Sequence, residues 1–365
     1  MVRFTVLASG SRGNCTVISG GRTRILVDAG LSCRELFRRM KLAGEDPATL
    51  DAIVITHEHQ DHINGLAVTA RKLGVPVYFS EATHRAWMRW LTPRRQMSYA
   101  QWLELCRKQA AERQGEPLEL PDPVKAVDPI AVAASTEASD CDPEEPETEK
   151  PEKIDAECAA DLSQPNSSAT HSVSGPALAT GDEAALKETM PTLKDEPTWL
   201  PSVEYFEAGK SFTIGDIALS PFTIPHDAAD PVGFVLSAEG IRLGFATDLG
   251  YVTPNVKHQL RNLDLLLLES NHDLDMLRDG PYPWSVKQRV LSRVGHLSNE
   301  ATCEFLTNSY DGQAAYVILA HLSENNNLPD LARVAAERAL VDRATLLANR
   351  LLLAEQDQPL VPINF

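Results

Sequence analysis

Three histidines and two acidic residues lie within the seven residues THEHQDH, at positions 56–62. His57, His59 and His62 can each offer a neutral imidazole nitrogen, and Asp61 can offer a carboxylate oxygen. Zinc and similar divalent ions prefer these ligands. A solvated polar loop accounts for one or two such residues but not for this arrangement, so the stretch predicts a metal site.

Three further residues of metal-ligand type follow strand-like runs in the second half of the chain. His226 comes directly after SPFTIP, Asp248 after LGFAT and His321 after YVILA. Loops at the edge of a sheet are where a scaffold presents functional groups. One such histidine is usually a polar strand end, but three such residues together with the crowded loop predict one joint site.

The elements that must position these residues alternate between short strands and helices. In the first 84 residues we expect strands at 3–9, 23–30, 50–57 and 75–80, and helices at 32–44 and 65–74. From residue 202 we expect strands at 203–209, 211–224, 232–240, 241–248, 264–270 and 314–321, and helices at 299–309 and 328–340. Two strand-rich halves, each with helices, predict an α/β fold of two packed sheets covered on both outer faces, a four-layer αββα sandwich.

A long insertion is expected to interrupt this single domain of residues 1–365 at about 88–200. Its acidic part, residues 134–198, holds 16 acids against four lysines, no Phe, Tyr or Trp, and only six Ile, Leu or Val. Such a segment cannot bury enough apolar surface to offset its chain entropy, so we expect it to be largely disordered. It carries −12 of the total charge of −17, which leaves about −5 for the rest, and a nucleic-acid substrate is therefore not excluded.

The stretch at about 85–115 is different, because Trp87, Trp90, Tyr99 and Trp102 stand among arginines and lysines. We interpret it as a pair of amphipathic helices with inward-facing tryptophans. The alternative is a basic, aromatic platform for single-stranded nucleic acid.

Cysteine usage and the N-terminus indicate a cytoplasmic protein. The six cysteines are scattered and form no CxxC pair, which is typical of reduced thiols. The apolar run at the N-terminus is too short for a signal peptide, and no stretch approaches the ~20 apolar residues of a membrane helix. We therefore expect no membrane partner, and the sequence points to no particular protein partner.

The ligand pattern resembles a known superfamily. His57-x-His59-x-Asp61-His62, followed by His226, Asp248 and His321, is similar to the metallo-β-lactamase fold in its two-metal form. The stretches LASGSRGNC, HDAADPVGF, ATDLG, ESNHD, GHLSNEAT and AHLSENNN resemble the YycJ (WalJ) family of bacterial metallohydrolases, relatives of ribonuclease Z and ribonuclease J. The resemblance covers residues 1–84 and 200–365 and implies a 5′-to-3′ DNA exonuclease.

The resemblance also implies how two metal ions are held. One would be bound by His57, His59 and His226, the other by Asp61, His62 and His321, with Asp248 as the bridge. Zinc is the first expectation, and manganese and iron also suit these ligands. Two metals ~3.5–4 Å apart can share a hydroxide nucleophile and stabilise both oxygens of an in-line displacement at phosphorus.

Proton transfer is expected from residues outside the metal ligands. Ribonuclease Z enzymes use a glutamate and a histidine as a relay, and Glu269 and His296 resemble that pair; His272 is the competing candidate. With Asp61 these are the expected catalytic residues, although a hydrogen-bonded structural role for both histidines stays open. Asp28 is expected to orient a ligand histidine.

A turn near the N-terminus is a weaker candidate for substrate binding. Ser9, Gly10, Ser11, Gly13 and Asn14 form a small, flexible run that can offer backbone N–H groups to a phosphate. Glycine-serine turns are common, so the pattern alone has little specificity.

The leading functional interpretation is a metal-dependent phosphodiesterase, a DNA exonuclease. The first alternative is another hydrolase of this fold that acts on a thioester, a lactone or a β-lactam. A secreted β-lactamase would need a signal peptide, which is missing. A glyoxalase II-like enzyme would need an extended helical domain at the C-terminus, but only 44 residues follow His321. A ribonuclease J-like enzyme would carry a large folded insertion between Asp248 and His321, but this interval is only 73 residues. The second alternative is a non-catalytic binding protein, which the complete set of seven ligands disfavours.

Overall fold

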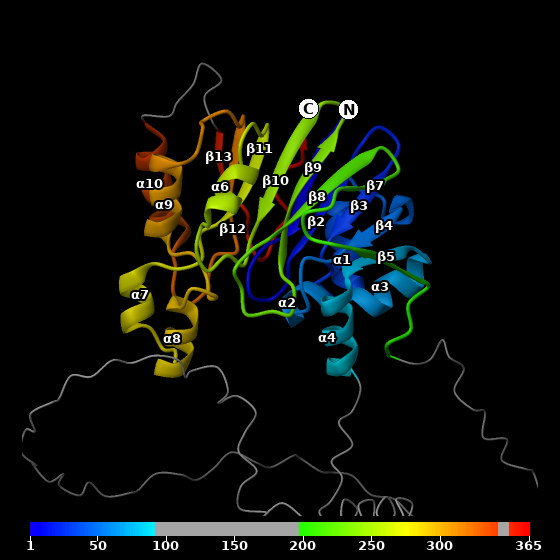
Figure 1. Ribbon diagram of the computed structural model, residues 1–365, viewed down its shortest axis with the longest axis horizontal. Coiled ribbons are helices and arrows are strands. Elements are labelled where there is room, and N and C mark those ends of the chain that lie inside the picture. The colour runs from blue at the N-terminus through cyan, green and yellow to red at the C-terminus, as the bar shows by residue number, and fades with distance from the viewer. Residues whose placement is uncertain (92–196, 342–349) are drawn as a thin grey trace, which may run out of the picture. The chain divides into compact units, whose positions relative to one another are not determined.

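Two seven-stranded β-sheets lie face to face in this computed structural model, which describes residues 1–91, 197–341 and 350–365 (Figure 1). The first sheet has the order β14-β1-β2-β3-β4-β5-β6. Its strands are β1 (Arg3–Ala8), β2 (Cys15–Ser19), β3 (Arg24–Val27), β4 (Ala52–Val54), β5 (Pro76–Ser80), β6 (Ser202–Phe206) and β14 (Ile363–Asn364). The second sheet has the order β13-β12-β11-β10-β9-β8-β7. Its strands are β7 (Phe212–Ile214), β8 (Ile217–Thr223), β9 (Val232–Ala238), β10 (Ile241–Ala246), β11 (Leu265–Glu269), β12 (Tyr316–Ala320) and β13 (Arg350–Leu353).

The two sheets share one topology. In the first, β14, β1, β2 and β3 pair antiparallel and β3 to β6 pair parallel. In the second, β7 to β10 pair antiparallel and β10 to β13 pair parallel. Each sheet therefore contains a run of parallel strands whose carboxyl ends meet at one edge, where loops can gather functional groups.

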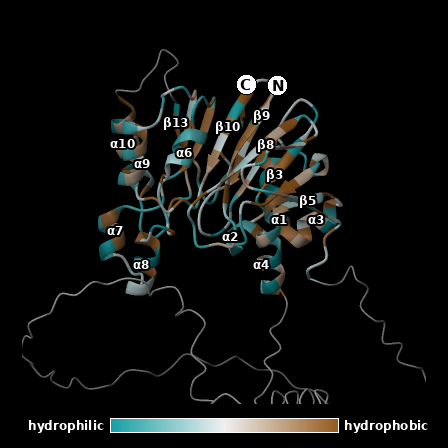
Figure 2. Ribbon diagram, viewed as in Figure 1, coloured by the Kyte–Doolittle hydropathy of each residue, from teal (hydrophilic) through white to brown (hydrophobic). Residues whose placement is uncertain are grey.

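Three apolar clusters hold the layers together. The largest lies between the sheets and takes buried side chains from both, among them Phe4 and Ile25 from the first and Phe234 and Leu267 from the second. The other two lie between each sheet and its outer helices. Figure 2 shows the strands mainly in the hydrophobic colour, as expected for strands covered on both faces.

Helices cover the outer face of each sheet. On the first sheet these are α1 (Cys33–Leu42), α3 (Leu66–Leu73) and α4 (Glu81–Leu91), with the short α2 (Gln60–Ile63) and η1 (Pro47–Thr49) in the loops. On the second they are α6 (Pro254–Gln259), α9 (Asn299–Asn308) and α10 (Pro329–Leu340), while α7 (Leu274–Asp279) and α8 (Trp284–Leu291) lie in the connection from β11 to α9. The predicted αββα sandwich is confirmed.

The register of the parallel strands brings the second-half residues to one edge. Ala246 on β10 pairs with Leu268 on β11, and Glu269 on β11 pairs with Ala320 on β12. Asp248 and His321, which follow these strands closely, therefore lie beside Glu269. The same logic places Asp28 beside the end of β4, because β3 and β4 are also parallel.

Several elements were not expected from the sequence. These are β2, η1, α2, α6, α7, α8, β13 and β14. Most are short, and α7 and α8 have no marked apolar period. The single strand expected at 211–224 is wrong as well, because the chain turns at Gly215 and forms the antiparallel pair β7 and β8. The insertion predicted at 88–200 lies mostly outside the described residues. Its acidic part, up to residue 196, and the proposed helices, beyond residue 91, also lie outside them. Trp87 is buried on α4, whereas Trp90 is exposed.

No helix within the described ranges has the length and apolar character needed to cross a membrane.

Gly30 fixes the loop that carries Asp61. A Cβ atom at this position would lie 1.6 Å from the carbonyl oxygen of Asp61 and 2.6 Å from the backbone nitrogen of Asn14. We expect Gly30→Ala to lower the free energy of unfolding by about 3 kcal/mol, because two backbone segments must move apart. At Gly74, where φ is +70° and no atom lies within 4 Å, the same change should cost only about 1 kcal/mol. Urea denaturation of both variants tests this, and equal losses would contradict it.

Candidate metal centre

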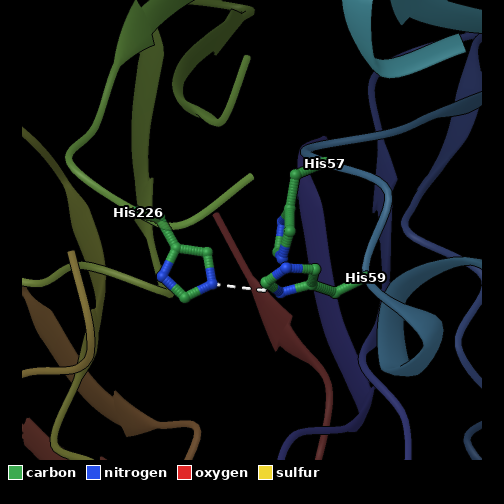
Figure 3. A group of neighbouring side chains, drawn as sticks. All are labelled: His57, His59 and His226. Carbon is green, nitrogen blue, oxygen red and sulfur yellow. Dashed lines mark hydrogen bonds between the residues drawn. The ribbon is translucent and has the colours of Figure 1, made fainter. Parts of the chain in front are cut away.

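Three imidazoles from the two halves of the chain converge at the sheet edge. His57 and His59 follow β4, and His226 follows β8 and faces them from the opposite side (Figure 3). One ring nitrogen of each lies within 4.8 Å of the others. Nδ1 of His59 and Nε2 of His226 are 3.1 Å apart.

Hydrogen bonds to oxygen atoms decide which nitrogens carry a proton. Nδ1 of His226 lies 3.0 Å from the carbonyl oxygen of Gly295, and Nε2 of His59 lies 3.2 Å from that of Asp227. Carbonyl oxygens only accept, so these nitrogens donate and the facing nitrogens keep their lone pairs. Nε2 of His57 is also buried and has no hydrogen-bond partner. Three converging lone pairs repel one another unless a cation lies between them, which is the donor set of a metal site.

A second group of ligand atoms lies next to the first. It consists of Asp61, His62, Asp248 and His321. Nε2 of His321 is 3.3 Å from Oδ2 of Asp61, and Nε2 of His62 is 3.2 Å from Oδ2 of Asp248. Asp248 also extends toward the first group, since its Oδ1 lies 3.8 Å from Nε2 of His226. The same Oδ1 lies 3.5 Å from Nδ1 of His321, so the Asp248 carboxylate is within reach of both groups.

Two buried carboxylates orient the histidines of this second group. Oδ2 of Asp28 is 2.8 Å from Nδ1 of His62, and Oε1 of Glu269 is 2.8 Å from Nδ1 of His321. Each bond fixes the proton on Nδ1 and leaves Nε2 for a ligand role. The sequence-based expectation for Asp28 therefore matches its contacts.

Glu269 contacts more residues than the sequence indicated. The same Oε1 atom also lies 2.8 Å from Nδ1 of His296, while Oε2 accepts from the backbone nitrogens of Leu249 and Leu297. Burial raises the pKa of Glu269. The charge of His296 and the hydrogen bonds from His296 and His321 outweigh burial and lower this pKa to about 2. Glu269 therefore stays ionised and ties the predicted relay histidine to a predicted ligand histidine.

The two histidine candidates for proton transfer lie in different surroundings. His296 lines a cavity of about 240 Å³ together with His59, Asp61, Asp248 and His321. His272 is buried, has no hydrogen-bond partner on either nitrogen and is not among the residues that line this cavity. Burial lowers the pKa of His272 to about 4, which makes it neutral at physiological pH.

Backbone strain is concentrated at the same place. Asp28, Asp248 and His321 have φ values of 60°, 59° and 57°, and they are three of the five non-glycine residues with positive φ in the described ranges. Each such conformation costs on the order of 1–3 kcal/mol and persists only where the surroundings enforce it. Two of the three are predicted metal ligands, and the third orients one.

Much of the glycine-serine turn is engaged within the protein, whereas Ser11 lines the cavity, so the contact with a phosphate stays a prediction for that residue. The backbone nitrogens of Gly10, Gly13 and Asn14 donate to atoms of the protein, so they are not free for a phosphate. Instead, Nδ2 of Asn14 lies 3.1 Å from both Oδ2 of Asp61 and Nε2 of His62, and Ser9 Oγ accepts from the backbone nitrogen of His321. The turn thereby supports the ligand residues.

A charged residue at the cavity and its ion-pair partner were missed by the sequence reasoning. Arg289 on α8 lines the cavity and forms a two-point ion pair with Asp227. Asp227 directly follows the predicted ligand His226, which was the signal available in the sequence. Nothing near Arg289 in the sequence marked it, because α8 was not predicted.

Family models match both halves of the chain. The model described as "Metallo-beta-lactamase superfamily" matches residues 8–147, and that described as "Beta-lactamase superfamily domain" matches residues 177–322. The first span contains the residues of the 56–62 stretch, and the second contains His226, Asp248 and His321.

Curated relatives extend the likeness over nearly the whole chain. It is 27% identical to "Exodeoxyribonuclease YycJ" of Bacillus anthracis over 342 residues, which covers 94% of this chain and 90% of the relative. It is 28% identical to "Exodeoxyribonuclease WalJ" of Streptococcus pneumoniae serotype 2 over 332 residues, covering 91% and 86%. The resemblance predicted from the sequence is confirmed.

Solved structures show the same fold at low sequence identity. The metallo-beta-lactamase fold protein YhfI of Bacillus subtilis superposes with a TM-score of 0.54 at 12% identity, covering 99% of each chain. Zn²⁺-bound PqqB of Methylobacterium extorquens gives 0.50 at 12% identity, covering 98% of this chain and 99% of the other.

The two ligand groups should differ in protonation before a metal binds. Burial lowers the pKa of His57 and that of His226, so both are neutral. Burial also lowers the pKa of His62 and of His321. The nearby carboxylates of Asp248 and Asp61 outweigh burial, and the net pKa of both histidines lies well above the usual value. A raised pKa means that the proton is still bound at neutral pH, so a metal must displace it, and apparent affinity at this group should fall as the pH falls.

Imidazole NMR of the metal-free protein between pH 5 and 9 tests this difference. We expect the signals of His62 and His321 to titrate above pH 6.5 and those of His57 and His226 below it. The variants His62→Gln and His57→Gln serve to assign the signals. Titration of all four imidazoles at or below about pH 6.5 would contradict the prediction.

Proposed function

We propose that this chain, which belongs to the metallo-β-lactamase superfamily and is a hydrolase, is a metal-dependent phosphodiesterase that degrades DNA as a 5′-to-3′ exonuclease. The observation that carries the proposal is the pair of ligand groups joined by Asp248 at one wall of the cavity. Such a pair of sites suits in-line displacement at phosphorus. The names of the two exodeoxyribonuclease relatives support DNA as the substrate.

Seven residues would hold two divalent ions, with zinc as the first choice and manganese or iron as the others. The first ion would be held by His57, His59 and His226, the second by Asp61, His62 and His321, with Asp248 between them. When bound, such ions lower the pKa of a coordinated water and neutralise charge on phosphoryl oxygens. The facing lone pairs of His59 and His226 and the unpartnered Nε2 of His57 fit this assignment.

His296 supplies the proton to the leaving oxygen. Its Nδ1 is bound to Glu269, so Nε2 is the nitrogen left for the cavity that the residue lines. Glu269 keeps the ring in this orientation and, through the same oxygen, holds His321. The donor and the metal ligand therefore keep a fixed spacing.

Cys15 and Cys33, which are buried and unpaired, fit the cytoplasmic location predicted from the sequence.

The function is tested with end-labelled single- and double-stranded DNA and matched RNA, with Zn²⁺, Mn²⁺ or Fe²⁺ and with EDTA. We expect metal-dependent release of nucleotides from the 5′ end of DNA. If the metal-loaded protein cleaves neither nucleic acid nor an activated phosphodiester, the proposal is wrong, and thioesters and lactones become the substrates to test.

The role of His296 gives a differential prediction. His296→Ala should lose about 10²–10⁴ in rate on DNA, while metal content stays unchanged, because the leaving alkoxide needs a proton. Bis(p-nitrophenyl) phosphate has a leaving group that barely needs protonation, so the same variant should lose far less on it. His272→Ala is the control and should lose little on either substrate. Equal losses of the His296 variant on both substrates would remove it from the acid role.

A further inference from the structure

One fixed positive charge lines the cavity together with several of the predicted metal ligands. Among the described residues that line it, Arg289 is the one lysine or arginine, and the others are polar, apolar, acidic or imidazole side chains. An arginine at such a place is suited to phosphate because its planar guanidinium offers several N–H donors at fixed angles.

The guanidinium is held from one side only. Nε and Nη2 donate to the two carboxylate oxygens of Asp227, the second at 3.1 Å. No described residue binds Nη1, so its two N–H groups and the second N–H of Nη2 remain as donors. Arg289 can therefore keep its bond to Asp227 and bind an anion at the same time.

Asp227 sets the distance between Arg289 and the metal ligands. Its Oδ1 lies 3.4 Å from Nε2 of His226, one of the nitrogens with a converging lone pair. Oδ1 of Asp227 thus links the two, since it lies 3.1 Å from Nη2 of Arg289 and 3.4 Å from Nε2 of His226. A single phosphodiester group is large enough to contact both.

The backbone places Arg289 and His296 on one tight turn. The nitrogen of Ser292 donates to the carbonyl oxygen of Arg289, and the nitrogen of His296 donates to that of Val290. Gly295 makes this turn possible, since a Cβ there would lie 2.1 Å from the Val290 oxygen and 2.4 Å from the Arg289 oxygen. Both side chains therefore reach the same cavity from one rigid segment.

The geometry points to Arg289 as the residue that binds a non-bridging oxygen of the phosphodiester group being cleaved, with Asp227 as the positioning residue that orients its guanidinium. This inference rests on the proposed phosphodiesterase function and adds a substrate contact to it. A contact of this kind favours an anionic phosphodiester over a neutral thioester or lactone, because only the phosphodiester brings a negative charge to the guanidinium.

The test compares Arg289→Ala, Arg289→Lys and Arg278→Ala in the metal-loaded enzyme. Arg278 on α7 is a matched control, since it is exposed, paired with Asp275 and Asp279, and absent from the cavity wall. We expect Arg289→Ala to lower kcat/KM about 10- to 100-fold on both DNA and bis(p-nitrophenyl) phosphate, because both contain the cleaved phosphodiester. Arg289→Lys should lose less, and Arg278→Ala should match the wild type.

Binding of thymidine 5′-monophosphate, measured by calorimetry, gives a readout that needs no turnover. We expect it to weaken about ten-fold in Arg289→Ala, with metal content and circular dichroism unchanged. Wild-type values for this variant in both assays would overturn the inference while leaving the phosphodiesterase function intact. A loss of activity on DNA alone would also overturn it, because Arg289 would then bind a neighbouring phosphate and not the one that is cleaved. A wild type that cleaves neither phosphodiester would overturn the function and this inference together.

Discussion

The burial of several carboxylates beside several imidazoles is the constraint on which the rest of the structure depends. Asp28, Asp248 and Glu269 are all almost fully inaccessible to solvent. An unpaired charge in such a position costs several kcal/mol, so each needs a donor or a cation. Histidines meet this need on one side of each carboxylate, and bound divalent ions would meet the remainder at Asp248. Protons on His62 and His321 and metal ions are thus alternative ways to balance the same negative charge.

The fold satisfies this constraint by repeating one arrangement of strands. Each sheet has three antiparallel pairings followed by three parallel pairings. The carboxyl ends of the parallel strands of both sheets present the site residues. The first half contributes a dense loop after β4, and the second contributes single residues after β8, β10 and β12. No sequence repeat marks this internal likeness, because the two halves share strand order and direction rather than side chains.

Much of the fold and the composition of the site could be predicted from the sequence, but their connections could not. The spacing of His57, His59 and Asp61 is local and therefore visible, and strand-like runs before Asp248 and His321 marked their positions. The double contact of Glu269 joins residues 27 and 52 positions away, which only the sheet order brings together. Arg289 was missed because α8 is short, and its partner Asp227 lies 62 residues earlier in the chain.

The central claim is that Asp248 joins two metal sites in one chain. Elemental analysis after reconstitution and removal of unbound metal tests it most directly, on the wild type and on Asp248→Ala. The account predicts two ions per wild-type chain and loss from both sites in the variant, because the Asp248 carboxylate lies within reach of both ligand groups. One ion or none in the wild type, or two ions retained by Asp248→Ala, would contradict it.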